Sequence, residues 1–176
     1  DKAMLAALAD VVDEATKAFD GFNYTQALES AESFFWAFCD DHLELVKDRA
    51  YGLQGDVAAD SAKAALNIAL ETLLKLFAPF LPFVTEEVWS WTHDTSIHTS
   101  AWPQVADLRG IGGDASSQAA VAEVLSQLRK VKSEAKVSMK AGLRNVVISA
   151  PSAAIAHIKS AEADLVAAGR VDGGFT

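Results

Sequence analysis

Cysteine is nearly absent from this sequence, and its scarcity restricts the kinds of site that the chain can build. Cys39 is the only cysteine among 176 residues, so an internal disulfide is impossible and a zinc site built on thiolates is excluded. The four histidines are scattered singly and give no spacing typical of metal ligands. We therefore expect no metal site, and a reducing, cytoplasmic compartment fits the composition.

Long apolar runs and targeting signals are also missing. No stretch approaches the roughly 20 apolar residues of a membrane-spanning helix, and the N-terminal letters DKAMLAALAD lack the layout of a secretory signal. The composition, 51% apolar and 22% charged, is typical of a folded, soluble protein. We expect one domain, or one domain with a small appendage, that has no membrane partner.

Motifs for nucleotide binding and covalent catalysis are absent as well. The glycines of GIGGD at 110–114 follow no predicted strand and precede no Lys-Ser/Thr pair, so we interpret them as a flexible linker. Cys39 lies within a predicted helix among aromatic residues, where an inert, buried thiol is expected. Glu86 and Glu87 point in different directions from a helix and form no catalytic pair. We expect them in its first turn, after an N-cap at Thr85.

Positive charge is the scarce sign, and its distribution is uneven. The net charge of −9 argues against a general nucleic-acid binder, because phosphate affinity comes from Lys and Arg. Residues 1–105 carry 6 basic and 17 acidic side chains, whereas residues 106–176 carry 9 basic and 7 acidic ones. Against Glu134 alone, residues 129–144 hold a basic patch that consists of Arg129, Lys130, Lys132, Lys136, Lys140 and Arg144.

The basic patch has two interpretations. On a helix, Arg129, Lys132 and Lys136 fall within about 60° of one another, beside the apolar stripe. Such a row either contacts phosphate or forms a solvated face, and Lys140 and Arg144 continue it into a loop and a strand. Because the patch lies on an otherwise acidic chain, we favour phosphate contact.

Three further candidates lie in the stretch FFWAFCDDHLELVKDRAYG at 34–52. Lys47 and Arg49 lie near the expected end of a helix, where they either balance the helix dipole or contact phosphate. Trp36 lies off the main apolar stripe, so it either packs against the core or a neighbouring domain or stacks on a nucleobase.

Apolar periodicity predicts a mainly α fold with a change of composition after residue 103. Four helices are expected before that point: over the first 20 residues, about 23–50, 56–77 with Asp56 as N-cap, and after Thr85. Four elements are expected in the second part: a helix over about 118–137, a strand over 144–151, a helix from Ser152 to about 168 that Gly169 stops, and a short strand over 170–176. We predict an antiparallel helical bundle over 1–103, a linker over 104–117 and a small α/β appendage over 118–176.

Several stretches of the sequence match one known family. These are ALESAESFFWAFCDDHLELVKDRAYG at 27–52, LLKLFAPFLPFVTEEVWSW at 73–91 and SIHTSAWP at 96–103. Together they resemble the anticodon-binding region of class I aminoacyl-tRNA synthetases, in the subgroup of the valyl, isoleucyl and leucyl enzymes. The letters FFWAFCD at 34–40 are similar to the bacterial valyl branch.

This resemblance implies a module that binds the anticodon stem-loop of a tRNA, with valine tRNA as the expected partner. The catalytic and editing domains would belong to the same parent chain, where ATP and Mg²⁺ would act. The catalytic signature His-Ile-Gly-His is absent, and KVSMK at 136–140 follows the bundle, where the family's similar catalytic loop does not occur. We therefore expect a C-terminal piece with no catalytic residue and no cofactor of its own.

Two alternatives stay open at this point. The first is the same module from an isoleucyl or leucyl enzyme. The second is a protein-interaction bundle without an RNA role, in which the basic helix docks on an acidic partner.

Overall fold

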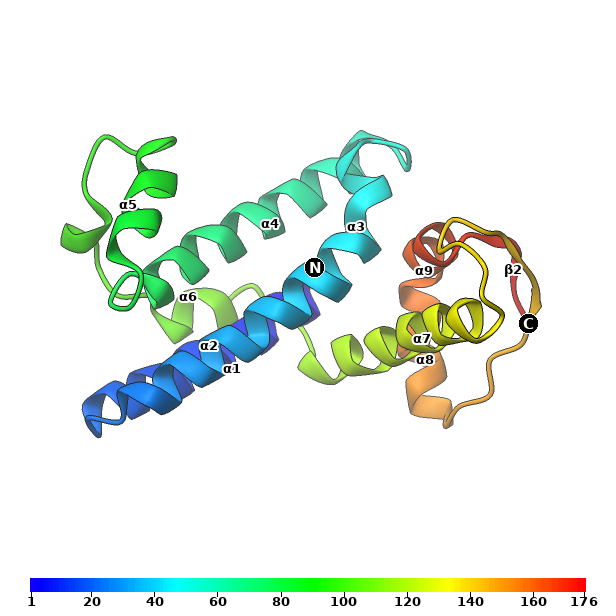
Figure 1. Cartoon of the computed structure of the whole chain (residues 1–176), viewed down its shortest axis with the longest axis horizontal. Coiled ribbons are helices and arrows are strands. Elements are labelled where there is room, and N and C mark those ends of the chain that lie inside the picture. Colours follow the sequence, from blue (N-terminus) through cyan, green and yellow to red (C-terminus); the bar gives the residue numbers. More distant parts are fainter. The chain divides into compact units, whose positions relative to one another are not determined.

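Helices make up most of the structure, a computed structural model in which all of residues 1–176 are described (Figure 1). The helices of the first part are α1 (Lys2–Asp20), α2 (Tyr24–Ala37), η1 (Phe38–His42), α3 (Leu43–Ala50), α4 (Asp56–Phe77), α5 (Pro82–Ser90) and η2 (Ile97–Thr99). The elements that follow are α6 (Val105–Arg109), α7 (Ala115–Glu134), β1 (Leu143–Val146), α8 (Ser152–Ser160), α9 (Glu162–Gly169) and β2 (Val171–Phe175). The predicted mainly α fold with a small α/β appendage is confirmed.

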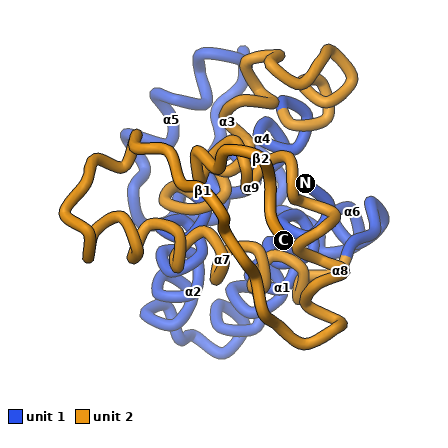
Figure 2. The backbone as a smooth tube through the Cα atoms, turned by 90° about the vertical axis from the view of Figure 1, so that its right-hand side faces the viewer, with its two compact units in different colours: residues 1–38, 63–113 blue, residues 39–62, 114–176 orange.

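The chain divides into two compact units, and each is built from two separate stretches (Figure 2). Unit 1 contains residues 1–38 and 63–113, and unit 2 contains residues 39–62 and 114–176. The boundaries proposed from the sequence stay a prediction about domains, although α6 places one short helix inside the predicted linker.

The long helices of unit 1 follow the predicted apolar stripes. On α1, Leu5, Leu8 and Val12 are buried at steps of three and four residues, and this helix packs against α2 and α6. Burying each such side chain contributes about 1.5–3 kcal/mol relative to exposure. Asn23 caps α2, because its side chain accepts a hydrogen bond from the Gln26 N–H at 3.3 Å.

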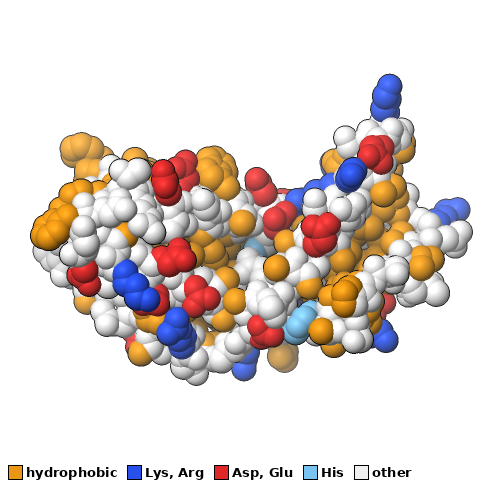
Figure 3. Space-filling model, turned by 90° about the horizontal axis from the view of Figure 1, so that it is seen from below, with side chains coloured by type: hydrophobic (Ala, Val, Ile, Leu, Met, Phe, Trp, Pro, Cys, Tyr) orange, Lys and Arg blue, Asp and Glu red, His pale blue; other side chains and the backbone are white.

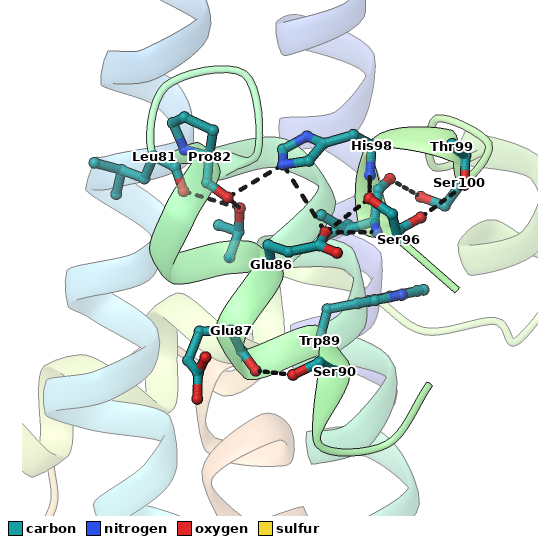
Figure 4. Close-up of polar contacts among 12 residues, drawn as sticks. Leu81, Pro82, Glu86, Glu87, Trp89, Ser90, Ser96, His98, Thr99 and Ser100 are labelled. Carbon is teal, nitrogen blue, oxygen red and sulfur yellow. Dashed lines mark hydrogen bonds and ion pairs between the residues drawn. The ribbon is translucent and has the colours of Figure 1, made fainter. Parts of the chain in front are cut away.

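The corner between α5 and η2 is fixed by one carboxylate (Figure 4). Glu86 accepts hydrogen bonds from the Ser96 hydroxyl at 2.9 Å and from the backbone N–H of Ile97 at 3.0 Å. The ring of His98 lies 3.1 Å from the carbonyl oxygen of Pro82, measured from Nε2. Glu86 therefore satisfies the first N–H of η2 rather than the N-terminus of its own helix.

Helix α5 begins earlier than predicted. Pro82 is its first residue and Leu81 its N-cap, so Thr85 lies inside the helix and donates from its hydroxyl to the Leu81 carbonyl at 2.9 Å. Proline suits the first helical position because the N–H that it lacks has no intrahelical partner there. The prediction of Thr85 as the N-cap, with Glu86 and Glu87 in the first turn, is wrong.

Two tryptophans anchor the rest of this corner. Trp89 is buried against Ile97, and its Nε1 donates to the Thr95 carbonyl at 2.8 Å. Trp102 donates from Nε1 to the hydroxyl of Thr16 on α1 at 2.9 Å. Both rings therefore bury apolar surface while their N–H groups keep a partner.

The core of unit 2 joins α7 to α8 and α9. Its buried members are Val121 and Leu125 from α7, Ile158 from α8 and Leu165 from α9. Strands β1 and β2 pair in parallel, and α8 and α9 form the crossover connection that parallel pairing requires.

Two predicted helices are interrupted. The helix expected over 23–50 contains the π-helical segment η1, and the helix expected over 152–168 is two helices that meet at Ala161. A π-helical turn such as η1 contains one residue more than an α-helical turn. The apolar stripe continues on both sides of it, so the apolar period in the sequence does not reveal the π-helical turn.

Gly113 makes GIGGD a packed turn of unit 1. Its φ of +130° is strained for any residue with a side chain, and a Cβ at this position would overlap the backbone carbonyl of Lys2. The neighbouring Gly112 has a φ of +78°, but a Cβ there would meet open space. The interpretation of this segment as a flexible linker therefore misses a close backbone approach.

This difference gives a test of the turn. We expect Gly113→Ala to lower the free energy of unfolding by roughly 2 kcal/mol or more, since backbone strain and overlap add. Gly112→Ala is the matched control and should cost about 1 kcal/mol, from strain alone. Chemical denaturation of both variants measures the difference, and equal costs would contradict the packing of Gly113 on α1.

Candidate nucleic-acid interface

A groove in unit 2 brings four of the predicted residues together. It encloses about 350 Å³ between α3, α7, α9 and the turn that follows α7. The charged side chains that line it are Lys47, Arg129, Lys132, Lys140 and Arg170, with Glu44 and Asp48. We call this hollow the basic groove. Figure 3 shows one face of the molecule, on which positively charged Lys and Arg side chains lie among negatively charged Asp and Glu side chains.

Lys132 lies inside the wall of the basic groove. Its residue is 2% exposed, and its ammonium donates to the carbonyls of Met139 at 2.8 Å and Gly169 at 2.9 Å. Burial lowers the pKa of Lys132 from its usual value, and the positive charge of Arg170 lowers it further. The expectation of phosphate contact does not fit this placement, because an ammonium that is buried and bonded to two backbone carbonyls cannot reach a ligand in solution.

The burial of Lys132 follows from the α7 stripe. Val121, Leu125 and Leu128 are buried on the same helix, and Lys132 occupies the next step of this row, four residues beyond Leu128. Val131, which the apolar pattern assigns to the stripe, is 52% exposed instead. The sequence does contain a signal for the burial of Lys132, because this residue lies four positions after Leu128 on the apolar face. The charge of lysine, however, argues against burial.

Gly169 allows α9 to approach α7 closely. A Cβ at this position would lie 2.6 Å from Cδ1 of Leu128, so a larger residue would require the buried Leu128 side chain to move. The next residue, Arg170, takes the left-handed conformation with φ 52° and ends the helix. Its exposed side chain lines the basic groove, and it lies outside the set of residues predicted from the sequence.

Arg129 is held by the π-helical segment. Its guanidinium forms an ion pair with Asp41 at 2.7 Å and donates a second hydrogen bond to the backbone carbonyl of Asp40. The side chain is about one-third exposed, so this contact orders the guanidinium at the groove edge. Acidic residues of η1 therefore compensate part of the positive charge.

The two candidates on α3 have different surroundings. Lys47 is exposed and pairs with Glu44 at 2.6 Å, and this hydrogen bond raises the pKa of Lys47. Arg49 pairs with Asp164 on α9 at 2.9 Å, and the two side chains are only 14% and 11% exposed. Gln54 also donates to Asp164, at 3.3 Å. Arg49 thus fastens α3 to α9, whereas Lys47 lies on the surface.

The remaining basic residues are exposed, and Lys136 does not continue the helical row that the sequence predicts with Arg129 and Lys132. Helix α7 ends at Glu134, and Lys136 follows it in a left-handed conformation with φ 54°. Lys130 is exposed on α7, and Arg144 on β1 forms an exposed ion pair with Asp172 at 3.2 Å.

Lys140 and Arg170 connect two hollows. Besides the basic groove, both residues line a second hollow of about 490 Å³, which α9, β2 and Gly142 also border. The two cations therefore face a continuous stretch of surface in unit 2.

Trp36 belongs to unit 1 and is half-exposed on α2. Its ring meets that of Phe35 edge-on at 5.4 Å, and its Nε1 lies 3.5 Å from the Glu32 carboxylate. This exposure places the ring at the surface of unit 1, and stacking on a nucleobase stays a prediction.

Residues 1–176 contain neither a cluster of metal ligands nor a membrane-spanning helix. No three His, Cys, Asp or Glu side chains come together in a way that would hold a metal ion. None of the helices combines the length and the apolar character needed to cross a membrane.

A family model described as the anticodon-binding domain of tRNA ligase matches residues 1–147. The chain belongs to this family. It is 53% identical to the valine–tRNA ligase of Cutibacterium acnes over 167 residues, which cover 94% of this chain and 19% of that protein. It is also 53% identical to the enzyme of Thermobifida fusca over 173 residues and 46% identical to that of Salinispora tropica over 189 residues. The chain spans about one fifth of the length of these relatives.

The burial of Lys132 in this anticodon-binding domain gives a direct chemical test. In the folded chain, we expect an amine-reactive label to modify Lys132 at least about tenfold more slowly than the exposed Lys130. Unfolding in guanidinium should remove the difference. Mass spectrometry of labelled peptides measures both rates, and equal labelling in the folded chain would contradict the bridge from Lys132 to Met139 and Gly169.

The buried ion pair gives a second test. Replacing Asp164 by Asn removes the carboxylate charge that pairs with the Arg49 guanidinium, so we expect a loss of about 3 kcal/mol in unfolding free energy. Asp172→Asn is the matched control, because it breaks the exposed pair with Arg144 and should change stability by less than about 0.5 kcal/mol. Thermal and denaturant unfolding would compare them, and similar losses would argue against a fastening role for Arg49.

Proposed function

We propose that this chain is the part of a valine–tRNA ligase that binds the anticodon stem-loop of valine tRNA in the cytoplasm. The main support is the basic groove, which gathers four accessible cationic side chains, Lys47, Arg129, Lys140 and Arg170, from distant segments of a chain with a net charge of −9. The relatives reported above are all valine–tRNA ligases, which supports valine over isoleucine or leucine.

The groove offers phosphate contacts of two kinds. Three exposed cations lie on different segments: Lys47, Lys140 and Arg170. In this proposal they contact the phosphates of the RNA backbone, and each contact releases counterions from the RNA. Arg129 is already ordered by η1, and three of its five N–H donors remain for a phosphate oxygen. Lys130, Lys136 and Arg144 extend the positive surface beyond the groove in this proposal.

Base recognition needs a different kind of contact. Bases of an anticodon loop are unstacked, so they can stack on aromatic rings and be read along their edges. Trp36 is the aromatic candidate that the sequence supplies, and its exposure is compatible with this role. The phosphate contacts would hold the loop while such rings meet the bases.

Catalysis belongs to the rest of the parent enzyme in this proposal. ATP and Mg²⁺ would act in its catalytic domain, beside an editing domain on the same polypeptide. The glycines of this chain do not fit a phosphate loop, because GIGGD connects α6 to α7 and Gly113 packs on the Lys2 carbonyl. The residues present bind and orient the tRNA.

The proposal predicts a salt-dependent loss of tRNA affinity. In the full-length polypeptide, we expect Lys140→Gln with Arg170→Gln to weaken binding of valine tRNA. The slope of log K against log salt should become shallower by roughly 1.5, because two phosphate contacts are lost. Fluorescence anisotropy with labelled tRNA at several salt concentrations measures both quantities.

Lys159→Gln is the matched control, since Lys159 is exposed on α8 and does not line the groove. It should leave affinity and slope unchanged. If the double variant binds like the wild type, the groove is not the tRNA site. If the wild-type protein binds valine tRNA no better than isoleucine tRNA, the assignment to valine fails.

A further inference from the structure

Exposed apolar side chains gather at one end of unit 1. They come from the turn between α1 and α2 and from the start of α5, and we call them the apolar end patch: Phe22, Tyr24, Leu81, Phe83 and Val84. Phe83 is 89% exposed and Phe22 is 78% exposed. In Figure 3, several hydrophobic side chains lie at the left-hand end of the face shown, the side on which Figure 1 draws this turn and α5.

Ring contacts link the two segments of the patch. Phe22 meets Tyr24 edge-on at 6.4 Å, and Tyr24 lies 5.8 Å from Phe19. Phe19 in turn lies 5.7 Å from Phe80, the neighbour of Leu81. The patch is therefore one connected aromatic surface, which differs from the single exposed apolar residues of ordinary protein surfaces.

Backbone conformation holds Phe22 in this position. Its φ of 57° is in the left-handed region, which is unfavourable for a residue with a Cβ. Two hydrogen bonds fix the turn, from the Phe22 N–H to the Phe19 carbonyl at 3.0 Å and from the Asn23 N–H to the Ala18 carbonyl at 2.8 Å. A strained turn that presents a phenyl ring to solvent indicates a surface with a partner.

The charge of unit 1 identifies the class of partner. Its two stretches contain 5 basic and 12 acidic residues. Acidic residues also flank the patch itself in the sequence, with Asp20 before the turn and Glu86 and Glu87 after Val84, so this surface repels a phosphate backbone. An apolar protein surface, which carries no charge to repel, is the complementary partner.

We propose that the apolar end patch docks on an apolar surface elsewhere in the same polypeptide. This inference rests on the proposed function, in which the chain is one part of a valine–tRNA ligase. The relatives extend far beyond the matched region, since this chain spans only 19–22% of their length. A surface on the same polypeptide meets the patch at high effective concentration and keeps it from solvent.

Hydroxyl-radical footprinting of the full-length polypeptide tests this docking without tRNA. The chain has two tyrosines, of which Tyr24 belongs to the patch and Tyr51 lies in unit 2. Their exposures, 51% and 75%, predict that Tyr24 is oxidised at about two-thirds of the rate of Tyr51. If the patch is docked, the oxidation rate of Tyr24 should instead be at least about fivefold lower than that of Tyr51, because interface cores exclude water.

Phe83→Asp provides the second arm of the test. Phe83 is too exposed to support the fold of unit 1, so this variant should fold normally and weaken only the docking. We expect the Tyr24 rate to rise toward that of Tyr51, while Tyr51 stays unchanged.

Three results would overturn the inference. Oxidation of wild-type Tyr24 at about two-thirds of the Tyr51 rate would show an uncovered patch. Protection that disappears on dilution would assign the patch to a second copy of the protein, and protection that needs added tRNA would assign it to RNA. The tRNA affinity of the same preparation tests the proposed function separately, so the failure of one idea is distinguishable from the failure of the other.

Discussion

The buried ammonium of Lys132 is the contact on which the basic groove depends. It joins α7 to the Met139 carbonyl in the following turn and to the Gly169 carbonyl at the end of α9. Lys140 and Arg170 each follow one of these acceptors directly in the sequence. The buried Lys132 ammonium therefore fixes the positions of the exposed Lys140 and Arg170. Removing this ammonium would leave the Met139 and Gly169 carbonyls without their hydrogen-bond donor. The pair of Arg49 with Asp164 adds a second fastening, between α3 and α9.

Several cations of unit 2 have an acidic partner, which helps to explain how an acidic chain supports a basic groove. Lys47 pairs with Glu44, and Arg129 pairs with Asp41. Such pairs contribute little stability at the surface, but they restrict the conformations of long side chains. The positive potential of the groove is consequently local, and the RNA binding that we propose would depend on shape as well as on net charge.

Sequence periodicity predicts most helices here because each buries a continuous apolar face, as Leu5 and Leu8 do on α1. It does not predict contacts between distant segments. The role of Glu86 depends on Ser96 and Ile97 across the corner, and the burial of Lys132 depends on carbonyls from two other segments. Local charge counts for the candidate site therefore identify the region but do not separate buried cations from exposed ones. They also miss Arg170, because it lies alone in sequence.

The acidity of unit 1 has a consequence for recognition by unit 2. A polyanion gains energy only where cations are concentrated, and the 12 acidic residues against 5 basic ones in unit 1 oppose its binding there. Repulsion over one unit and attraction in one groove of the other together restrict the positions open to an RNA backbone. The same acidity leaves the apolar end patch of unit 1 to a protein surface. In these proposals, charge places the phosphate contacts in the basic groove of unit 2 and leaves the apolar end patch of unit 1 for a protein contact.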